Sequence, residues 1–178
     1  MTMVNRDALM VGAAKRVALF ALAALVAVGV CSAPAAAKPE KGKVFEDWGV
    51  VCETQADKSD KCFAQQVQTA KEGGKILTIA IGYIGAKGEA AVVAQLPLGI
   101  NLQVGAAMKI DEGTQFPLTV QTCAMSGCQV ATQLSDAQMK ALANGKTVTI
   151  GMVAWGKTET TVIPVPLKGL SASLAASR

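Results

Sequence analysis

The stretch CFAQQVQTAKEGGKILTIAIGYI, residues 62–84, contains the pattern that decides the fold. Two runs rich in apolar and β-branched residues, 62–69 and 76–84, flank the turn sequence Glu72-Gly73-Gly74-Lys75. Glycines at this position supply the positive φ angles that tight hairpin turns require. The second run is apolar at both odd and even positions, which is typical of a central strand covered on both faces. The stretch therefore predicts a β-hairpin whose second strand lies inside a sheet.

Similar short runs recur along the chain, separated by turn signals about every eight to twelve residues, and this spacing predicts an all-β sandwich or barrel. The other expected strands are 45–52, 90–96, 100–102, 106–110, 114–123, 128–132, 147–155 and 159–167. In the last of them, Pro164 and Pro166 lie two residues apart. Their missing N–H groups therefore fall on the same side, which suits an edge strand and discourages further pairing there.

One short helix is clearly signalled after residue 134. Ser135 can accept the first N-terminal hydrogen bond, and Gln138, three residues later, completes a capping box. Gly145 is a typical stop signal. Leu170 and Leu174 predict a further short terminal helix that packs against the sandwich.

The N-terminal residues 1–37 have the organisation of a secretory signal peptide. A basic start with Arg6, Lys15 and Arg16 precedes an uncharged apolar run over 17–30, and Ala35-Ala36-Ala37 forms a small-residue cleavage site. A retained membrane anchor is the alternative, because a span needs roughly 20 apolar residues. Cleavage is favoured, and it predicts an exported protein that is periplasmic, outer-membrane-associated or secreted.

Residues 38–178 are long enough for one core and too few for two comfortable domains. We expect a flexible lead over 38–44 and one domain over 45–178. Residues 1–37 contribute three basic side chains and one acidic one to the formal charge of +4, so +2 remains. The only basic cluster, Lys38, Lys41 and Lys43, falls in the lead. Nucleic acid is therefore a poor candidate ligand.

Four cysteines follow the signal: Cys52, Cys62, Cys123 and Cys128. An even number in an exported chain indicates disulfides. Of the three possible pairings, the nearest-neighbour one, Cys52–Cys62 with Cys123–Cys128, is favoured. A four-cysteine zinc site is the alternative, but the spacings do not match those of zinc ligands. We expect no metal and no cofactor.

The chain contains no histidine, which removes the usual general base and the Ser–His and Cys–His nucleophile pairs. Asp111 and Glu112 are the only adjacent acidic pair late in the chain, and they fall in a predicted turn. They are the only candidates for a carboxylate-dependent glycan hydrolase, and a solvated turn is the favoured interpretation. We therefore predict no catalytic residues.

Few aromatic residues are available for recognition. Trp48 lies four residues before Cys52 and is expected in the core beside that disulfide. Trp155 precedes a hairpin turn and is the candidate surface contact. Leu102 and Val104 are expected in the core rather than in a stripe that inserts into a membrane.

Several short motifs occur in an order that is informative as a set. They are WGVVC at 48–52, Cys62, LPLGINL at 96–102, GAAMKID at 105–111, CAMSGC at 123–128 and IPVPLKGL at 163–170. In this order they resemble the invasion-associated locus B family of exported bacterial proteins, over residues 45–174. The family more often has Ser and Phe where this chain has Pro166 and Leu170, a departure that affects terminal packing.

The resemblance implies an immunoglobulin-like antiparallel β-sandwich, which we expect here with one short helix and two disulfides. It also implies an exported protein linked in some pathogens to entry into host cells, and it transfers no catalytic or ligand-binding residue. The leading hypothesis is a non-enzymatic interaction protein whose partner is an unidentified protein, envelope or host-surface component, with possible peripheral outer-membrane association. The alternative is a periplasmic structural or stress-protection factor with no host role.

Overall fold

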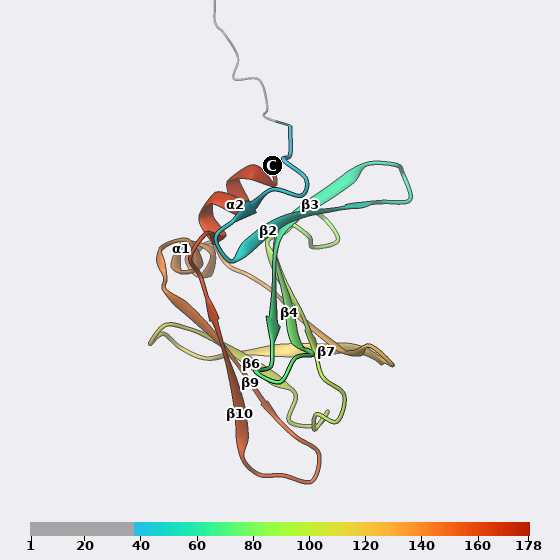
Figure 1. Cartoon of the computed structure of the whole chain (residues 1–178), viewed down its shortest axis with the longest axis vertical. Helices are drawn as coiled ribbons and strands as arrows, with labels where there is room; N and C mark the ends of the chain where they lie inside the picture. Colours follow the sequence, from blue (N-terminus) through green and yellow to red (C-terminus); the bar gives the residue numbers. More distant parts are fainter. Residues whose placement is uncertain (1–37) are drawn as a thin grey trace, which may run out of the picture. The chain divides into compact units, whose positions relative to one another are not determined.

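The computed structural model describes residues 38–178, so the predicted signal peptide over 1–37 lies outside the described residues. Figure 1 shows the arrangement of the elements in this part of the chain. The strands are β1 (Val44–Phe45), β2 (Trp48–Thr54), β3 (Asp60–Thr69), β4 (Lys75–Gly82), β5 (Ala91–Leu96), β6 (Ala106–Ile110), β7 (Phe116–Ala124), β8 (Gly127–Gln133), β9 (Thr147–Val153) and β10 (Thr160–Pro166). The helices are α1 (Asp136–Asn144) and α2 (Leu170–Ala176).

The strands form one continuous hydrogen-bonded order, β1-β2-β3-β4-β5-β8-β7-β6-β9-β10, in which the neighbours are antiparallel. Strand β7 connects the two parts of this order, because Leu118 pairs with Ala106 of β6 and Thr119 pairs with Ala131 of β8. The sheet curls around its own inner face (Figure 1). The predicted all-β, antiparallel fold with two disulfides is confirmed, and β7 links the two parts of the curled sheet.

The core lies on the inner face of the curled sheet. Leu77, Ile79 and Ile81 of β4 alternate along the strand and are fully buried. They belong to a cluster that extends along the chain from Trp48 to Leu174. The opposite face of β4 is covered less completely, because Thr78 remains partly exposed. Strand β4 is therefore fully covered on its inner face, as predicted, but only partly covered on its outer face.

The two ends of the strand order are tied together by one buried side chain. The indole Nε1 of Trp48, on β2, donates a hydrogen bond of 2.9 Å to the carbonyl of Pro166, at the end of β10. Strand β10 is an edge strand, as predicted, and β9 is the only strand of residues 38–178 that pairs with it. Pro166 has no N–H, and its carbonyl is satisfied by a side chain instead of a further strand.

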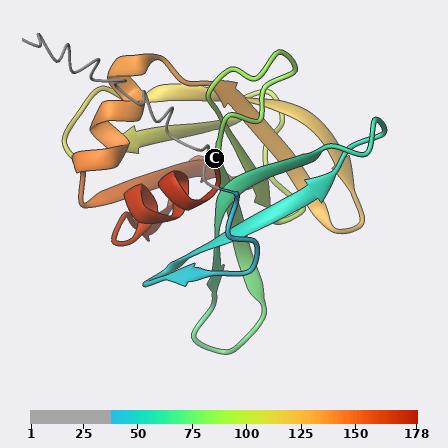
Figure 2. The ribbon, with the colours of Figure 1, turned by 90° about the horizontal axis from the view of Figure 1, so that it is seen from above.

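Helices α1 and α2 lie next to each other at one side of the domain (Figure 2). The predicted capping box of α1 is present: Ser135 Oγ accepts from the Gln138 backbone N–H at 3.2 Å, and Gln138 Oε1 accepts from the Ser135 N–H at 2.8 Å. Helix α2 is the short terminal helix expected from Leu170 and Leu174, both of which are buried, and it contacts β1, β2, β3 and α1.

Two local expectations need correction. The segment expected as a flexible lead is hydrogen-bonded to the domain, because the Glu40 N–H donates to Ala176 and the Gly42 N–H donates to Val50, both at 2.8 Å. The strand expected over 100–102 is not formed, and Ile100 makes only an isolated bridge with Ala154. The physical reason is a turn: Asn101 Oδ1 accepts the N–H groups of the residues two and three positions later.

Candidate functional site

Exposed apolar side chains gather at the end of the domain that lies away from α2. The exposed fractions are 56% for Leu98, 55% for Leu102, 62% for Val104 and 69% for Trp155. The first three lie in the loop between β5 and β6, and Trp155 lies in the β9–β10 hairpin, which projects away from α2 in Figure 1. We call these four residues the apolar loop end.

Backbone hydrogen bonds hold the two loops against each other. The Trp155 N–H donates to the Gly99 carbonyl and the Asn101 N–H donates to the Val153 carbonyl, both at 2.7 Å. Residues 97–105 include no charged side chain, whereas Lys157 and Glu159 flank the tip of the β9–β10 hairpin. The apolar loop end is therefore a braced surface without net charge.

The prediction that Leu102 and Val104 belong to the core is wrong. The turn at Asn101 reverses the chain before β6 begins at Ala106, so both side chains remain outside the sheet. Trp48 is fully buried, as predicted, and Trp155 is exposed. The role of Trp155 as a contact residue remains a prediction.

Both disulfides have the nearest-neighbour pairing that was favoured from the sequence. Cys52 lies directly opposite Cys62 in the β2–β3 hairpin, and Cys123 lies opposite Cys128 in the β7–β8 hairpin. Gly127, at the start of β8, has a φ of 126° and leaves no room for a side chain beside the Leu96 carbonyl. Each disulfide joins the two strands of one hairpin within the sheet. Because zinc is bound by free thiolates, the disulfides disfavour a four-cysteine zinc site.

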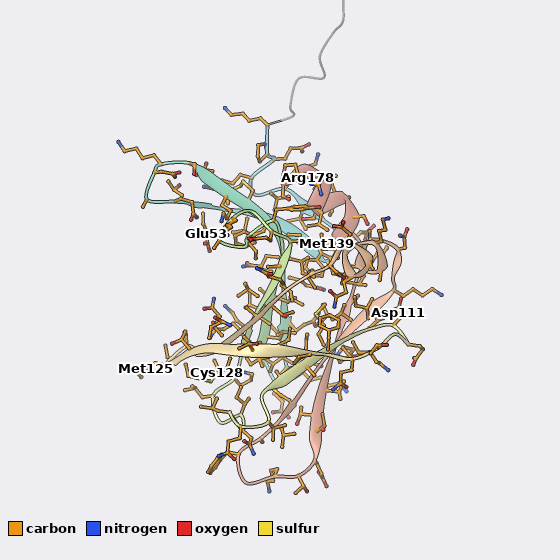
Figure 3. All side chains as sticks on the ribbon, turned by 180° about the vertical axis from the view of Figure 1, so that it is seen from behind. Glu53, Asp111, Met125, Cys128, Met139 and Arg178 are labelled. Carbon is orange, nitrogen blue, oxygen red and sulfur yellow. A yellow bond between two sulfur atoms is a disulfide. The ribbon has the colours of Figure 1, made fainter. Side chains whose placement is uncertain are left out.

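Between these two hairpins, the outer face of the sheet forms a hollow that the sequence analysis missed. Figure 3 shows Glu53 of the first hairpin and Cys128 and Met125 of the second on the same side of the domain. Two adjoining cavities of about 370 and about 610 Å³ lie over β3, β4, β5, β8 and β7, and they share Ile84, Val93 and Gln129. We call this hollow the sheet groove. Its signal in the sequence was the recurrence of Gln and Thr at outward positions of neighbouring strands, which cannot be aligned without the register.

Charged groups lie near the groove only at its margins. Lys61 Nζ donates to the Gly85 carbonyl at 3.1 Å, which ties the β2–β3 hairpin to the loop over 85–89. In that loop, backbone N–H groups of Glu89 itself and of Lys87 lower the pKa of the Glu89 carboxyl. In the β2–β3 turn, the hydroxyl and backbone N–H of Ser59 lower the pKa of Asp57. Asp57 is exposed and Glu89 is half-buried, and each carboxylate accepts hydrogen bonds that hold a surface turn.

The acidic pair Asp111-Glu112 is separated by its turn. Asp111 has a φ of 45°, and its Oδ1 accepts the N–H groups of Lys146 at 3.0 Å and Thr147 at 2.8 Å. The Glu112 side chain is 99% exposed and pairs with Lys109 at 3.3 Å. Asp111 therefore holds the start of β9 on the side of the domain away from the groove (Figure 3), and the two carboxylates do not share a site.

This role of Asp111 can be measured. Replacing Asp111 with alanine should lower the free energy of unfolding by about 1–3 kcal/mol, because two backbone donors lose a charged acceptor. Asp111→Asn keeps an oxygen acceptor and a residue that tolerates positive φ, so the loss should be smaller. Glu112→Ala is the matched control and should change stability by less than about 0.5 kcal/mol. Equal losses in Asp111→Ala and Glu112→Ala, measured by urea unfolding, would contradict this assignment.

Two further findings bear on the kind of site. Among residues 38–178, no three His, Cys, Asp or Glu side chains converge as metal ligands do. No helix within the same described residues has the length and hydropathy needed to cross a membrane.

These features define a small β-domain with two disulfides, exposed apolar loops and a hollow on the outer face of its sheet. The family model for Invasion associated locus B (IalB) protein matches residues 48–178, so the chain belongs to this family. It is similar to two proteins of Brucella abortus, from strains 2308 and 9-941, each described as an invasion protein B homolog. Each is 29% identical over 132 residues, which is 74% of this chain and 76% of the relative.

The fold is also similar to a solved structure. The crystal structure of invasion associated protein B from Bartonella henselae superposes with a TM-score of 0.68 at 21% sequence identity. The match covers 76% of this chain and 92% of the other. The family is named for its association with invasion and not for an enzymatic activity.

Proposed function

We propose that this chain is an exported, non-enzymatic interaction protein of the bacterial envelope that docks on a lipid surface through its apolar loop end. The observation that carries the proposal is the exposure of Trp155 beside Leu98, Leu102 and Val104 on two loops braced by hydrogen bonds. Tryptophan is favoured at membrane surfaces, where its ring contacts apolar lipid and its indole N–H faces water. The invasion-associated names of the family and its relatives support a role at the cell surface.

The chemistry of the loop end favours lipid over a charged partner. Residues 97–105 carry no charge, and Lys157 and Glu159 offset each other. Burying a large apolar side chain contributes about 1.5–3 kcal/mol. Four such side chains, with association costs subtracted, support weak and reversible docking. Binding should therefore depend little on anionic lipid or on salt.

The two tryptophans make a direct test available. Trp48 is fully buried and Trp155 is exposed, so a change in tryptophan emission on adding vesicles reports Trp155. We expect a blue shift and co-sedimentation with phosphatidylcholine vesicles, which change little when phosphatidylglycerol is added. Trp155→Ala should weaken partitioning about tenfold or more, and adding Leu98→Ser should abolish it.

Met125→Ser is the matched control, because Met125 is 97% exposed and lies at the tip of the β7–β8 hairpin, outside the loop end. This variant should partition like the unaltered protein. Absence of a spectral shift and of co-sedimentation would contradict lipid docking. Export is tested separately by mass spectrometry of the periplasmic fraction, where the proposal expects a product that begins at Lys38.

A further inference from the structure

The sheet groove, on a different face from the apolar loop end, has the features of a ligand site. We propose that it binds an uncharged glycan chain, which lies across β3, β4, β5 and β8 and is recognised by glutamine and threonine side chains. This inference does not depend on lipid docking, since the two surfaces share no residue.

The strand register creates two rows of side chains across the groove. In one row Gln65 lies opposite Ala80, Ala80 opposite Val93, and Val93 opposite Ala131. In the neighbouring row Thr78 lies opposite Gln95, and Gln95 lies opposite Gln129. The first row is a floor of mostly small apolar side chains, and the second is a line of hydrogen-bonding groups. A sugar ring is complementary to both rows, because its C–H faces are apolar and the hydroxyl groups at its rim form hydrogen bonds.

The polar groups of the groove have unused hydrogen-bonding capacity. The side-chain amides of Gln65, Gln95 and Gln129 form no hydrogen bond with any other group of residues 38–178. The hydroxyl oxygen of Thr78 is buried and also has no partner among these residues. Each amide provides two donors and an acceptor, so the row can both donate to hydroxyl groups and accept from them. The three amides are partly exposed, so a polyhydroxyl ligand over this face can reach them and supply partners.

The charge distribution selects a neutral ligand. No charged residue lies in the two rows, and the charges at the margin, Glu53 and Lys61, lie opposite each other in the β2–β3 hairpin with opposite signs. Lys61 is already engaged with the Gly85 carbonyl. An anionic polymer requires several Lys or Arg side chains along its path, and the groove does not provide them.

The backbone of the groove excludes addition of a peptide strand. Strands β4, β5 and β8 are each paired on both sides, so their N–H and C=O groups are occupied by the sheet. Strand addition needs an open edge. A ligand over this face is therefore read by side chains alone, which suits hydroxyl groups more than an extended peptide backbone.

The two stapled hairpins flank the groove and keep its walls in place before binding. Cys52–Cys62 joins the strands of the β2–β3 hairpin, and Cys123–Cys128 joins those of the β7–β8 hairpin. Such preorganisation lowers the entropic cost of binding. Phe63, the aromatic residue lining the groove, is only 5% exposed and offers little stacking surface. We therefore expect dissociation constants on the order of 0.1–10 mM.

The test uses oxidised residues 38–178, which contain the whole described core. Titration with chitohexaose and with maltohexaose, both uncharged, is followed by the side-chain amide resonances of the glutamines in ¹⁵N NMR spectra. At least one of them should shift the amides of Gln95 and Gln129. The double variant Gln95→Ala/Gln129→Ala should bind about tenfold or more weakly. Ala131→Leu, which fills the floor and removes no hydrogen-bonding group, should weaken binding similarly.

Gln103→Ala is the matched control, because Gln103 is exposed in the loop over 97–105 and lies outside the groove. It should bind like the unaltered protein. The proposal is overturned if neither hexasaccharide shifts these amides at concentrations on the order of 10 mM. It is also overturned if only anionic oligogalacturonate binds, or if sedimentation reveals a dimer that Ala131→Leu dissociates, because the groove would then hold an anion or a second copy.

Discussion

Replacing Trp48 with alanine is expected to lower the free energy of unfolding by about 3–5 kcal/mol, a large part of the stability of a domain of this size. The Trp48 side chain is fully buried in the core, and its indole N–H binds the Pro166 carbonyl 118 positions away. The substitution removes the packing of the largest core residue and the link between β2 and the end of β10. Guanidinium unfolding followed by circular dichroism measures the loss.

Two further variants separate these contributions. Trp48→Phe keeps most of the ring burial but leaves the Pro166 carbonyl without its donor, so we expect a smaller loss, about 1–3 kcal/mol. Trp155→Ala removes an exposed tryptophan and should change stability by less than about 0.5 kcal/mol. If Trp48→Ala and Trp155→Ala have similar effects on stability, the tie between the two ends of the sheet contributes little.

Removing both disulfides is expected to have an effect of comparable size. The bonds join cysteines separated by 10 and 5 positions, for which chain-entropy arguments give about 2.7 and about 2.1 kcal/mol. The two hairpins lie on separate parts of the sheet, so the losses should be nearly additive and total about 5 kcal/mol. Reduction with dithiothreitol should lower the guanidinium midpoint by a corresponding amount.

Paired substitutions assign the effect to each bond. Cys52→Ala/Cys62→Ala should cost slightly more stability than Cys123→Ala/Cys128→Ala, because the closed loop is longer. Once both pairs are replaced, dithiothreitol should have no further effect. A chain that unfolds at the same midpoint when oxidised and when reduced would contradict this account. Each pair should also weaken glycan binding in the groove if rigid walls matter to it.

The two candidate surfaces assign different tasks to different faces of one small domain. We propose that the apolar loop end docks on a lipid surface and that the polar sheet groove binds an uncharged glycan. Variants of Trp155 should leave the groove unaffected, and variants of Gln95 and Gln129 should leave vesicle binding unaffected. An envelope-associated protein with both properties would hold a saccharide ligand close to a membrane.

Features that depend on neighbouring residues could be predicted from the sequence. The capping box of α1 needs only Ser135 and Gln138, three positions apart, and both hydrogen bonds are present. The strand over 106–110 has the predicted bounds. Cys123 and Cys128 flank a tight turn, so their pairing follows from the local hairpin.

Features that depend on distant contacts were missed or incorrectly predicted. Apolar character alone placed Leu102 and Val104 in the core, whereas the turn in which Asn101 Oδ1 accepts backbone N–H groups leaves both side chains outward. The segment over 38–44 has no regular pattern, but backbone partners near residues 50 and 176 hold it in place. Asp111 is an exposed turn residue, as predicted, but its hydrogen bonds from the Lys146 and Thr147 amides, 35 and 36 positions later, were missed.

Alternation, turn residues and cysteine spacing are short-range properties, and they were sufficient for most of the strands, the helix cap, the disulfides and the all-β class. The groove and the apolar loop end were decided by register and by the curl of the sheet. Gln65, Thr78, Gln95 and Gln129 become neighbours only because four strands align them on one face. Trp155 meets the loop over 97–105 because Gly99 accepts its N–H and Val153 accepts the N–H of Asn101. Pairing between strands far apart in the chain sets these positions, and no local pattern of residues encodes it.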